Sequence, residues 1–219
     1  MSQDKDRSLE SKQNLQYEKA QFHTFDLGKR ESINSIINSF ETPDLLVANA
    51  GIAINGAIGE IKQTEKDYYY YLMCGGVIDL IEGFIPKMVE KNSGRIVIIS
   101  SIGATTAMPK SSLYSSIKSG VHAYGRSIST ELQDKNISVT VSLPGYVKTN
   151  AHERAGLNHL KDKVPWWMWI NAKQVVMETE KASIKGKAEI IPGKVYKLVR
   201  PFLNFNSAIR VWRKITRRN

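Results

Sequence analysis

The sequence has 219 residues, of which 42% are hydrophobic and 24% charged, the balance of a single globular domain. The opening residues are polar, no run of about 18 apolar residues occurs, and Cys74 is the only cysteine. These features argue against a secreted or membrane-spanning protein. They predict a cytoplasmic protein without disulfides or a thiolate metal cluster.

The formal net charge of +10 is concentrated toward the carboxyl-terminal end of the chain. Residues 185–219 contain ten lysines and arginines but a single acid, Glu189, so this segment carries ten minus one, or +9. The rest of the chain is close to neutral. The basic balance therefore describes the tail and predicts little about the body of the protein.

Short apolar runs alternate with longer segments of helical periodicity, which is typical of an α/β protein with a parallel sheet. We expect strands, in chain order, at residues 20–27, 44–48, 95–100, 137–143 and 188–191. We expect helices between them at residues 30–40, 65–89, 114–133 and 172–184. Residues 146–172 show neither periodicity and are expected to be irregular, and the tail has a helical pattern.

Three polar side chains in the middle of the sequence indicate acid–base chemistry. Tyr114 and Lys118 are four residues apart in an expected helix and so share one face. A neighbouring ammonium favours the phenolate and lowers the tyrosine pKa toward the working pH. Ser101 follows the strand at 95–100, at the carboxyl end of the strand, and parallel sheets bind ligands at this end. Its hydroxyl is therefore expected to hold a substrate oxygen. The pattern predicts carbonyl reduction.

A tyrosine followed four residues later by a lysine is weak evidence by itself, because a solvated helix face contains the same pair by chance. Of nine tyrosines, however, only Tyr114 has a lysine at this spacing. Asn-Ala-Gly at 49–51 follows one strand earlier and Pro-Gly at 144–145 follows one strand later. With these motifs in this order, the sequence resembles the short-chain dehydrogenase/reductase family over about residues 1–200.

The resemblance implies a Rossmann-type fold, a parallel sheet with helices on both faces, and an oxidoreductase that uses NADP or NAD, with NADP slightly favoured. It implies that Tyr114 is the acid or base, that Ser101 orients the substrate and that Lys118 binds the nicotinamide ribose. It also implies cofactor contacts for a further set of residues, namely Asp26, Asn49, Ala50, Gly51, Pro144, Gly145, Val147 and Thr149.

Two departures from the family pattern concern the cofactor and the proton. The family opens with a strand, a glycine-rich turn, a helix and a second strand, whereas the only glycine here before Gly51 is Gly28. Because the backbone of such a turn binds the cofactor pyrophosphate, we expect weak dinucleotide binding. Met73 stands where the family has an asparagine that anchors a relay water, and methionine cannot make those hydrogen bonds.

The expected fold therefore lacks the first strand, the first helix and most of the second strand of the family, which leaves residues 44–48 as an apolar edge. We hypothesise a longer parent protein, with either a misplaced start or a decayed gene. The alternative to an active oxidoreductase is a catalytically impaired pseudoenzyme that keeps the fold. Met73 and the missing turn favour the pseudoenzyme, whereas the intact Ser101, Tyr114 and Lys118 favour the enzyme.

Other features bear on substrates and partners. The family resemblance implies a homodimer through the helices at 65–89 and 114–133. The aromatic cluster at 165–169 either closes over an apolar carbonyl or alcohol substrate or packs its loop against the body. The four histidines show no spacing that predicts a metal site. No residue pattern identifies the substrate.

The tail at 201–219 is expected to form a unit separate from the domain at 1–200. Ile209, Trp212 and Ile215 make an apolar stripe flanked by basic residues, the composition of a helix that lies on a membrane surface. Membrane contact through residues 206–219 and a simple solvated helix explain this pattern equally well. Nucleic-acid binding is disfavoured, because one basic helix without a recognised motif is weak evidence.

Overall fold

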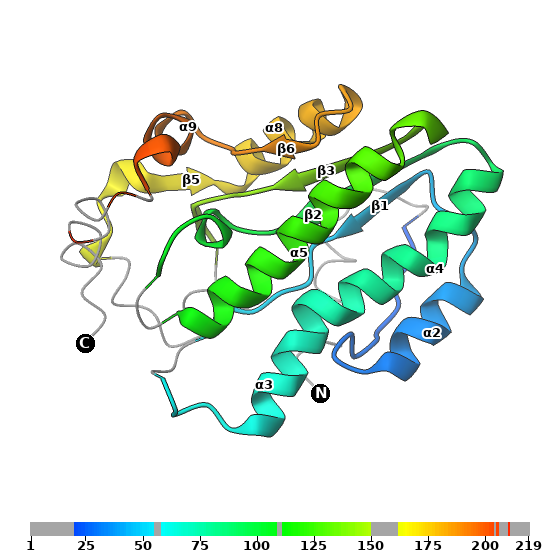
Figure 1. Ribbon diagram of the computed structural model, residues 1–219, viewed down its shortest axis with the longest axis horizontal. Helices are drawn as coiled ribbons and strands as arrows, with labels where there is room; N and C mark the ends of the chain where they lie inside the picture. Colours follow the sequence, from blue (N-terminus) through cyan, green and yellow to red (C-terminus); the bar gives the residue numbers. More distant parts are fainter. Residues whose placement is uncertain are drawn as a thin grey trace.

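The computed structural model describes residues 20–54, 58–108, 111–149 and 162–203, together with Phe205 and Arg210. Its main sheet has four strands in the order β1-β2-β3-β6 (Figure 1). These strands are β1 (Leu45–Ala48), β2 (Gly94–Ile99), β3 (Ile137–Ser142) and β6 (Glu189–Ile190). All three pairings are parallel, which confirms the predicted α/β class.

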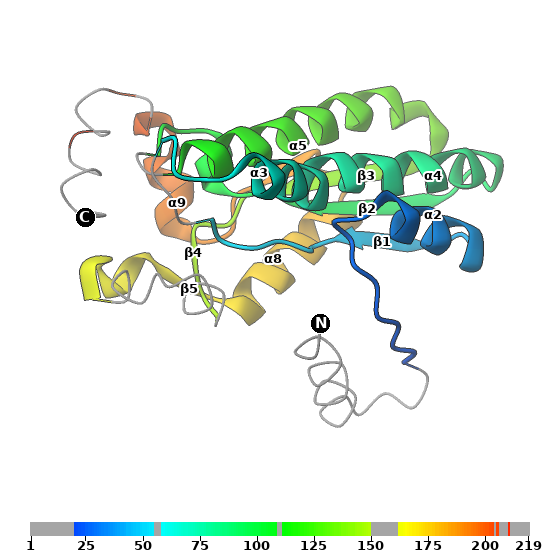
Figure 2. The same cartoon turned by 90° about the horizontal axis from the view of Figure 1, so that it is seen from below.

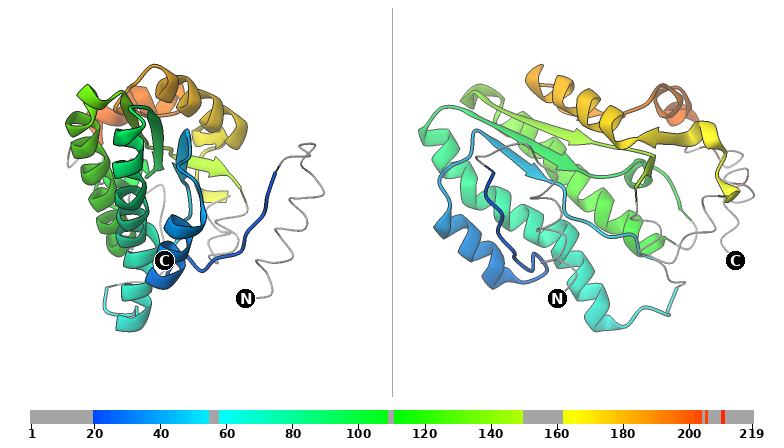
Figure 3. Two further views of the ribbon diagram at one scale, coloured as in Figure 1. Left: turned by 90° about the vertical axis from the view of Figure 1, so that its right-hand side faces the viewer. Right: turned by 180° about the vertical axis from the view of Figure 1, so that it is seen from behind.

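Helices cover both faces of the sheet, as expected. On one face α4 (Gly76–Glu90) and α5 (Ser112–Glu131) lie side by side, and α8 (Ala172–Ile184) covers the other face (Figures 2 and 3). The remaining helices described are α2 (Arg30–Ser39), which packs on α4, α3 (Gln63–Tyr70) and α9 (Lys194–Val199). The helices expected at 30–40, 114–133 and 172–184 are therefore confirmed within a few residues.

The core lies at β2 and β3, which are covered on both faces. Ile96, Ile98, Val139 and Val141 are each at most 1% exposed, as expected for central strands of a parallel sheet. Gly125 brings α5 close to these strands, because a Cβ at this position would lie only 2.5 Å from Val141 Cγ2. The close approach fixes α5, which carries two of the predicted site residues, over the middle of the sheet.

The helix expected over residues 65–89 is present but interrupted. Between α3 and α4 the chain makes one π-helical turn, Tyr71–Gly75, which buries Met73 and Cys74. Single π turns inside helices are frequent at functional sites. Here the turn places Met73 beside Gly51, at the end of the segment that follows β1.

The strand expected at residues 20–27 is wrong, because residues 20–26 form no strand. The described sheet ends at β1, so this segment has no neighbouring strand with which to pair its backbone. It is held instead by ring contacts, with the His23 ring centroid 4.8 Å from that of Phe40. As expected, β1 is an edge of the described sheet, and its Val47 is 49% exposed.

Residues 146–172 are not wholly irregular, which corrects a second expectation. They contain two three-residue strands, β4 (Tyr146–Lys148) and β5 (Trp169–Asn171), that pair in parallel. The strands are too short to show periodicity, and the ring contact of Tyr146 with Trp169, 5.4 Å between centroids, joins positions distant in sequence. Most of the tail at 206–219 lies outside the described residues.

Candidate active site

A cavity of about 400 Å³ opens at the carboxyl ends of β2 and β3, the edge at which open parallel sheets bind ligands. Its walls come from the segments after β1, β2 and β3 and from the first turns of α5 and α8. Nine of the predicted site residues line it, namely Asn49, Gly51, Ser101, Tyr114, Lys118, Pro144, Gly145, Val147 and Thr149. The fold therefore brings together residues that are up to a hundred positions apart.

Ser101 and Tyr114 face the same small region of this cavity. Ser101 follows β2 in an extended conformation, and its Oγ accepts a hydrogen bond of 3.1 Å from the Gly103 N–H. A Cβ built on Gly103 would lie 3.4 Å from Ser101 Oγ and 3.7 Å from Tyr114 Cε1. The hydroxyl and the phenol ring therefore flank one glycine, as the proposed chemistry requires of groups that share a substrate oxygen.

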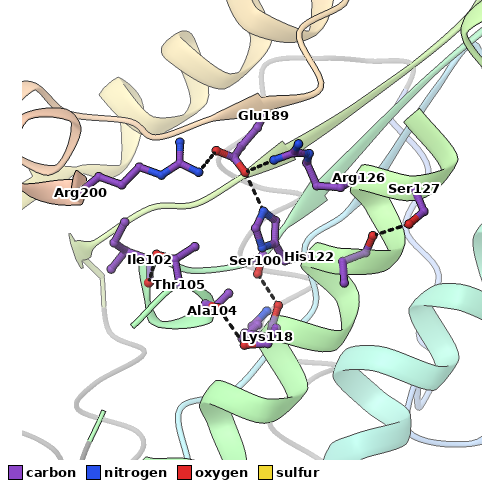
Figure 4. A network of polar contacts seen from close by, with 12 residues as sticks. Ser100, Ile102, Ala104, Thr105, Lys118, His122, Arg126, Ser127, Glu189 and Arg200 are labelled. Carbon is purple, nitrogen blue, oxygen red and sulfur yellow. Dashed lines mark hydrogen bonds and ion pairs between the residues drawn. The ribbon is translucent and has the colours of Figure 1, made fainter. Parts of the chain in front are cut away.

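Two side-chain hydrogen bonds fix the start of α5 against the end of β2. Ser100 Oγ donates to the Lys118 carbonyl at 2.8 Å, and Ser119 Oγ donates to the Ala104 carbonyl at 2.8 Å (Figure 4). Ser100 is buried, so its bond is shielded from water. These bonds hold the helical turn that joins Tyr114 to Lys118 in a fixed position beside Ser101.

Lys118 is a buried cation at the floor of the cavity. Its side chain is 5% exposed, and Nζ donates to the Ile99 carbonyl at 2.9 Å. Burial lowers the pKa of Lys118 to about 8, and the nearby Cys74 opposes this shift. Among the described residues Ile99 provides the one acceptor for an ammonium that has three donors. A ligand hydroxyl is the kind of group that would satisfy the others.

Met73 occupies the side of the cavity next to Lys118. A Cβ on Gly51 would be 3.6 Å from both Met73 Sδ and Lys118 Nζ, so the thioether and the ammonium border the same glycine. Met73 Sδ accepts the N–H of Ile52 at 3.4 Å. A thioether donates no hydrogen bond, so it cannot pass a proton onward from Lys118.

The structure places two of the predicted cofactor residues outside this cavity. Asp26 Oδ1 accepts hydrogen bonds of 3.0 Å from the Gly28 N–H and from Tyr68 Oη, which tie it to α3. Ala50 lines a separate cavity of about 60 Å³ between β1 and α4. Neither residue shares a wall with the Ser101, Tyr114 and Lys118 group.

The cavity also has walls that the sequence did not predict. An apolar wall comes from Ala172, Val175 and Val176 at the start of α8, and from Ile102 and Met108 after β2. The spacing of the three α8 residues marks one face of a helix, but it does not show which surface that face covers. Ile52, Ala53 and Ile54 after β1 and Ser111 before α5 also line the cavity and were not predicted.

Tyr196 of α9 supports the loop after β3 from behind, and sequence reasoning missed it as well. Its Oη accepts the Tyr146 N–H at 3.0 Å and donates to the Met168 carbonyl at 2.8 Å. Its ring fills the space beside Gly145, where a Cβ would lie 2.0 Å from Tyr196 Cζ. The ring and hydroxyl of Tyr196 thus fix the loop that forms one wall of the cavity.

Contacts of one carboxylate join the carboxyl-terminal segment to α5 (Figure 4). Glu189 of β6 pairs with Arg200 at 2.6 Å, with His122 at 2.7 Å and with Arg126 at 3.2 Å. Burial by itself would raise the pKa of Glu189, but the His122 hydrogen bond and the Arg200 charge hold it below the ordinary value. The carboxylate therefore stays ionised and links three elements around the site.

In the described part of the chain, no three His, Cys, Asp or Glu side chains are grouped so that they would hold a metal ion. None of the helices described there has the length and apolar character needed to span a membrane.

The comparisons with known proteins concern the family and the fold. The family model named "short chain dehydrogenase" matches residues 1–159. Among curated proteins, the Mus musculus "Dehydrogenase/reductase SDR family member 7B" is 35% identical over 137 residues, which cover 58% of this chain and 41% of the relative. The chain thus spans about two fifths of the length of this relative.

Solved structures show the same fold at lower sequence identity. A short-chain dehydrogenase from Streptomyces avermitilis is 21% identical with a TM-score of 0.75, over 96% of this chain and 85% of that one. A short-chain dehydrogenase from Sphingobium yanoikuyae, in complex with NADPH, is 20% identical with a TM-score of 0.70, over 86% and 71% of the two chains. The likeness extends over most of the described fold.

Proposed function

Given that the chain belongs to the short chain dehydrogenase family, we propose that it is an oxidoreductase that interconverts a carbonyl and an alcohol with NADP or NAD. The observation that carries this proposal is the single cavity lined by Ser101, Tyr114 and Lys118. A buried lysine with a pKa near 8 at the floor of such a cavity is poised to exchange protons near neutral pH.

Each of the three side chains has a distinct role in the proposed reaction. The bound nicotinamide supplies or accepts the hydride. Tyr114 gives the proton to the substrate oxygen or takes it back, while Ser101 Oγ holds that oxygen in place. Lys118 binds a ribose hydroxyl and favours the tyrosine phenolate through its charge. Burial matters here because the ammonium acts more strongly on a neighbouring oxygen when water is excluded.

The described residues fit the nicotinamide end of a dinucleotide better than its pyrophosphate end. Lys118 faces the cavity with donors to spare, and residues 144–149 form a wall that would lie along the nicotinamide. Gly28 does not offer an open glycine turn to a pyrophosphate, because the Tyr68 ring fills the space beside it. A Cβ built on Gly28 would lie only 2.1 Å from Tyr68 Cε2. We therefore include in the proposal weak dinucleotide binding, with NADP slightly preferred. The NADPH held by the Sphingobium relative supports that preference.

The proposal assigns the remaining cofactor contacts to the segment after β1 and to the loop after β3. Asn49 and Gly51 would border the nucleotide at the cavity, with Ala50 supporting them from the smaller cavity beside β1. Asp26 would contact the adenine, although its carboxylate is engaged by Tyr68 and would have to share that hydrogen bond.

A catalytically impaired protein is the second candidate, and one observation favours it. Met73 Sδ caps the Ile52 N–H and borders Lys118, so that no side chain at this position relays a proton. The intact group of Ser101, Tyr114 and Lys118 weighs against impairment. The two candidates differ in one measurable property, because only the enzyme transfers hydride.

A fluorescence titration with NADPH, followed by a carbonyl-reduction assay, tests the proposal. We expect weak binding and measurable NADPH consumption with a ketone or aldehyde. The apolar wall formed by Val175, Val176 and Met108 makes hydrophobic carbonyl compounds the first substrates to try. Binding without turnover over a broad panel would favour the impaired protein, and neither binding nor turnover would refute the oxidoreductase.

The proposal extends to assembly and to the tail. We propose a homodimer through the helices at 65–89 and 114–133, which in the structure lie next to each other within one chain. Analytical ultracentrifugation checks it, and a monomer at working concentration would refute it.

We also propose that residues 201–219 form a unit separate from the domain at 1–200. In this proposal the protein is cytoplasmic and contacts membranes through residues 206–219. Deleting 206–219 should then weaken co-sedimentation with anionic vesicles.

A further inference from the structure

A second cavity, of about 570 Å³, lies between α8 and the segment that runs from β6 into α9. It shares no lining residue with the candidate active site. Both helices lie along the β6 edge of the sheet, at the opposite side from β1 (Figure 1). Nothing in the proposed oxidoreductase chemistry uses this cavity.

The lining of this cavity is strongly basic. It contains a single acid, Glu178, and five lysines, a balance of five minus one, or +4, and the lysines are Lys181, Lys185, Lys187, Lys194 and Lys197. Like charges close together repel each other, so this group does not stabilise the fold by itself.

Glu178 does not neutralise the cluster. Its carboxylate already accepts hydrogen bonds from Lys197 Nζ at 2.6 Å, from Gln174 Nε2 at 2.8 Å and from the Gly193 N–H at 3.3 Å. The other four lysines have no acidic partner among the residues that the structure describes. Their charge is therefore available to an external anion.

Exposed apolar side chains lie beside the lysines in the chain or on the same helix faces. Trp167 lines the cavity and is 49% exposed, and its neighbour Trp166 is 83% exposed. On α8, exposed Met177 precedes Lys181 by four residues, so the two share one helix face. On α9, exposed Leu198 follows Lys194 by the same spacing. Exposed apolar groups rimmed by charged residues are the kind of surface that marks a contact with a protein or a membrane.

From these observations we propose that the lysine cavity and its apolar rim form a docking surface for anionic phospholipid membranes. Lysines beside an anionic leaflet each strengthen binding by about five-fold, and tryptophan prefers the boundary between headgroups and acyl chains. A soluble phosphate would match the lysines but would leave Trp166 and Leu198 without a partner. This surface is built from described residues and is separate from the tail at 206–219.

The test is co-sedimentation of the full chain with phosphatidylcholine vesicles that do or do not contain phosphatidylglycerol. Changing Lys181, Lys185 and Lys194 to Gln should weaken binding to the anionic vesicles about 100-fold. The matched control changes Lys62, Lys87 and Lys135 to Gln, which removes the same charge from exposed positions elsewhere and should cost less than about three-fold.

Two further variants separate a specific effect on binding from misfolding. Replacing the three cavity lysines by Arg should retain binding, because the charge is kept. Trp166→Ser should weaken binding several-fold without changing the unfolding temperature, because the ring is exposed. Equal losses in the cavity and control triples would overturn the proposal. So would loss in the Arg variant, equal binding to neutral vesicles, or full competition by inorganic pyrophosphate, which would indicate a soluble-anion site.

Discussion

The interior strands of the sheet and its β1 edge differ in how many neighbouring strands and side chains stabilise them. β2 and β3 each pair with strands on both sides and are buried on both faces, whereas β1 pairs only with β2 in the described sheet. Residues 20–26, before β1, form no strand. The proposed reacting side chains are attached to the interior, and Asp26 and Asn49 are attached near the edge. The proposed proton chemistry thus depends on the interior of the sheet, whereas the proposed contacts of Asp26 and Asn49 with the cofactor depend on its edge, and substitutions should separate the two.

The largest effect is expected at Lys118, the buried cation of the interior. Lys118→Met should lower kcat/KM by about 10² to 10⁴, because the charge beside the phenol is lost. The same change should raise the free energy of unfolding by about 1 to 3 kcal/mol, because a buried charge with little compensation is removed. Steady-state kinetics and urea unfolding measure both effects. Lys87→Met, at an exposed position, is the control, and a destabilised Lys118→Met protein would refute this account.

The dependence of the free energy of unfolding on pH should also reveal the buried Lys118. Folded Lys118 loses its proton near pH 8, whereas a lysine in the unfolded chain does so near pH 10.4. Between these values the unfolded state binds more protons, so stability should rise with pH, by at most about 1.4 kcal/mol per pH unit. Well below pH 8 Lys118 is protonated in both states, so its contribution to the free energy of unfolding does not change with pH. Urea titrations from pH 7 to about pH 10 should show this slope in the wild type. If Lys118→Met keeps it, the assignment is wrong.

A pair of valine truncations compares interior and edge directly. Val139→Ala should lower the free energy of unfolding by about 1 to 3 kcal/mol, because β3 is buried and the site cannot collapse fully. Val47→Ala in β1 should cost within about 0.5 kcal/mol, because half of that side chain is already in water. Similar losses at both positions would show that the edge is covered in solution.

The smallest effect is expected from Tyr196→Phe, which keeps the ring beside Gly145 and removes two hydrogen bonds. The loop after β3 should loosen, and KM for the cofactor should rise about 3- to 10-fold with a smaller change in kcat. Tyr124→Phe, which removes a hydrogen bond to Glu82 at the surface, is the matched control. An equal change in both variants would mean that Tyr196 does not position the loop.

Most of the candidate site was predictable because it follows from short motifs at the ends of buried strands. Residues 95–100 and 137–143 are apolar enough to mark central strands, and the positions of Ser101 and Pro144 follow from them. Nine of the predicted residues do line one cavity. Ala50 and Asp26 do not, because side chains on the edge segment point to α3 and α4 as well as toward the cavity.

The parts that could not be predicted depend on contacts between distant residues. Residues 20–27 have strand-like composition, but a strand needs a partner, and composition does not report whether one is present. β4 and β5 pair with Tyr146 opposite Trp169, a contact between distant positions, and neither three-residue segment shows a period. Tyr196 supports the loop after β3 from fifty positions away. That Lys181, Lys185, Lys187 and Lys194 line one cavity with a single acid, Glu178, which Lys197 already engages, likewise emerges only in the fold.

Under the proposed function, Ser101, Tyr114 and Lys118 act as one catalytic group. Its most direct test is a single-turnover measurement, in which protein loaded with NADPH is mixed with a carbonyl compound and the loss of cofactor fluorescence is followed. We expect Tyr114→Phe to slow this step by about 10² to 10⁴ while NADPH affinity stays within a few-fold of the wild type. An unchanged rate in the Tyr114→Phe protein would contradict it.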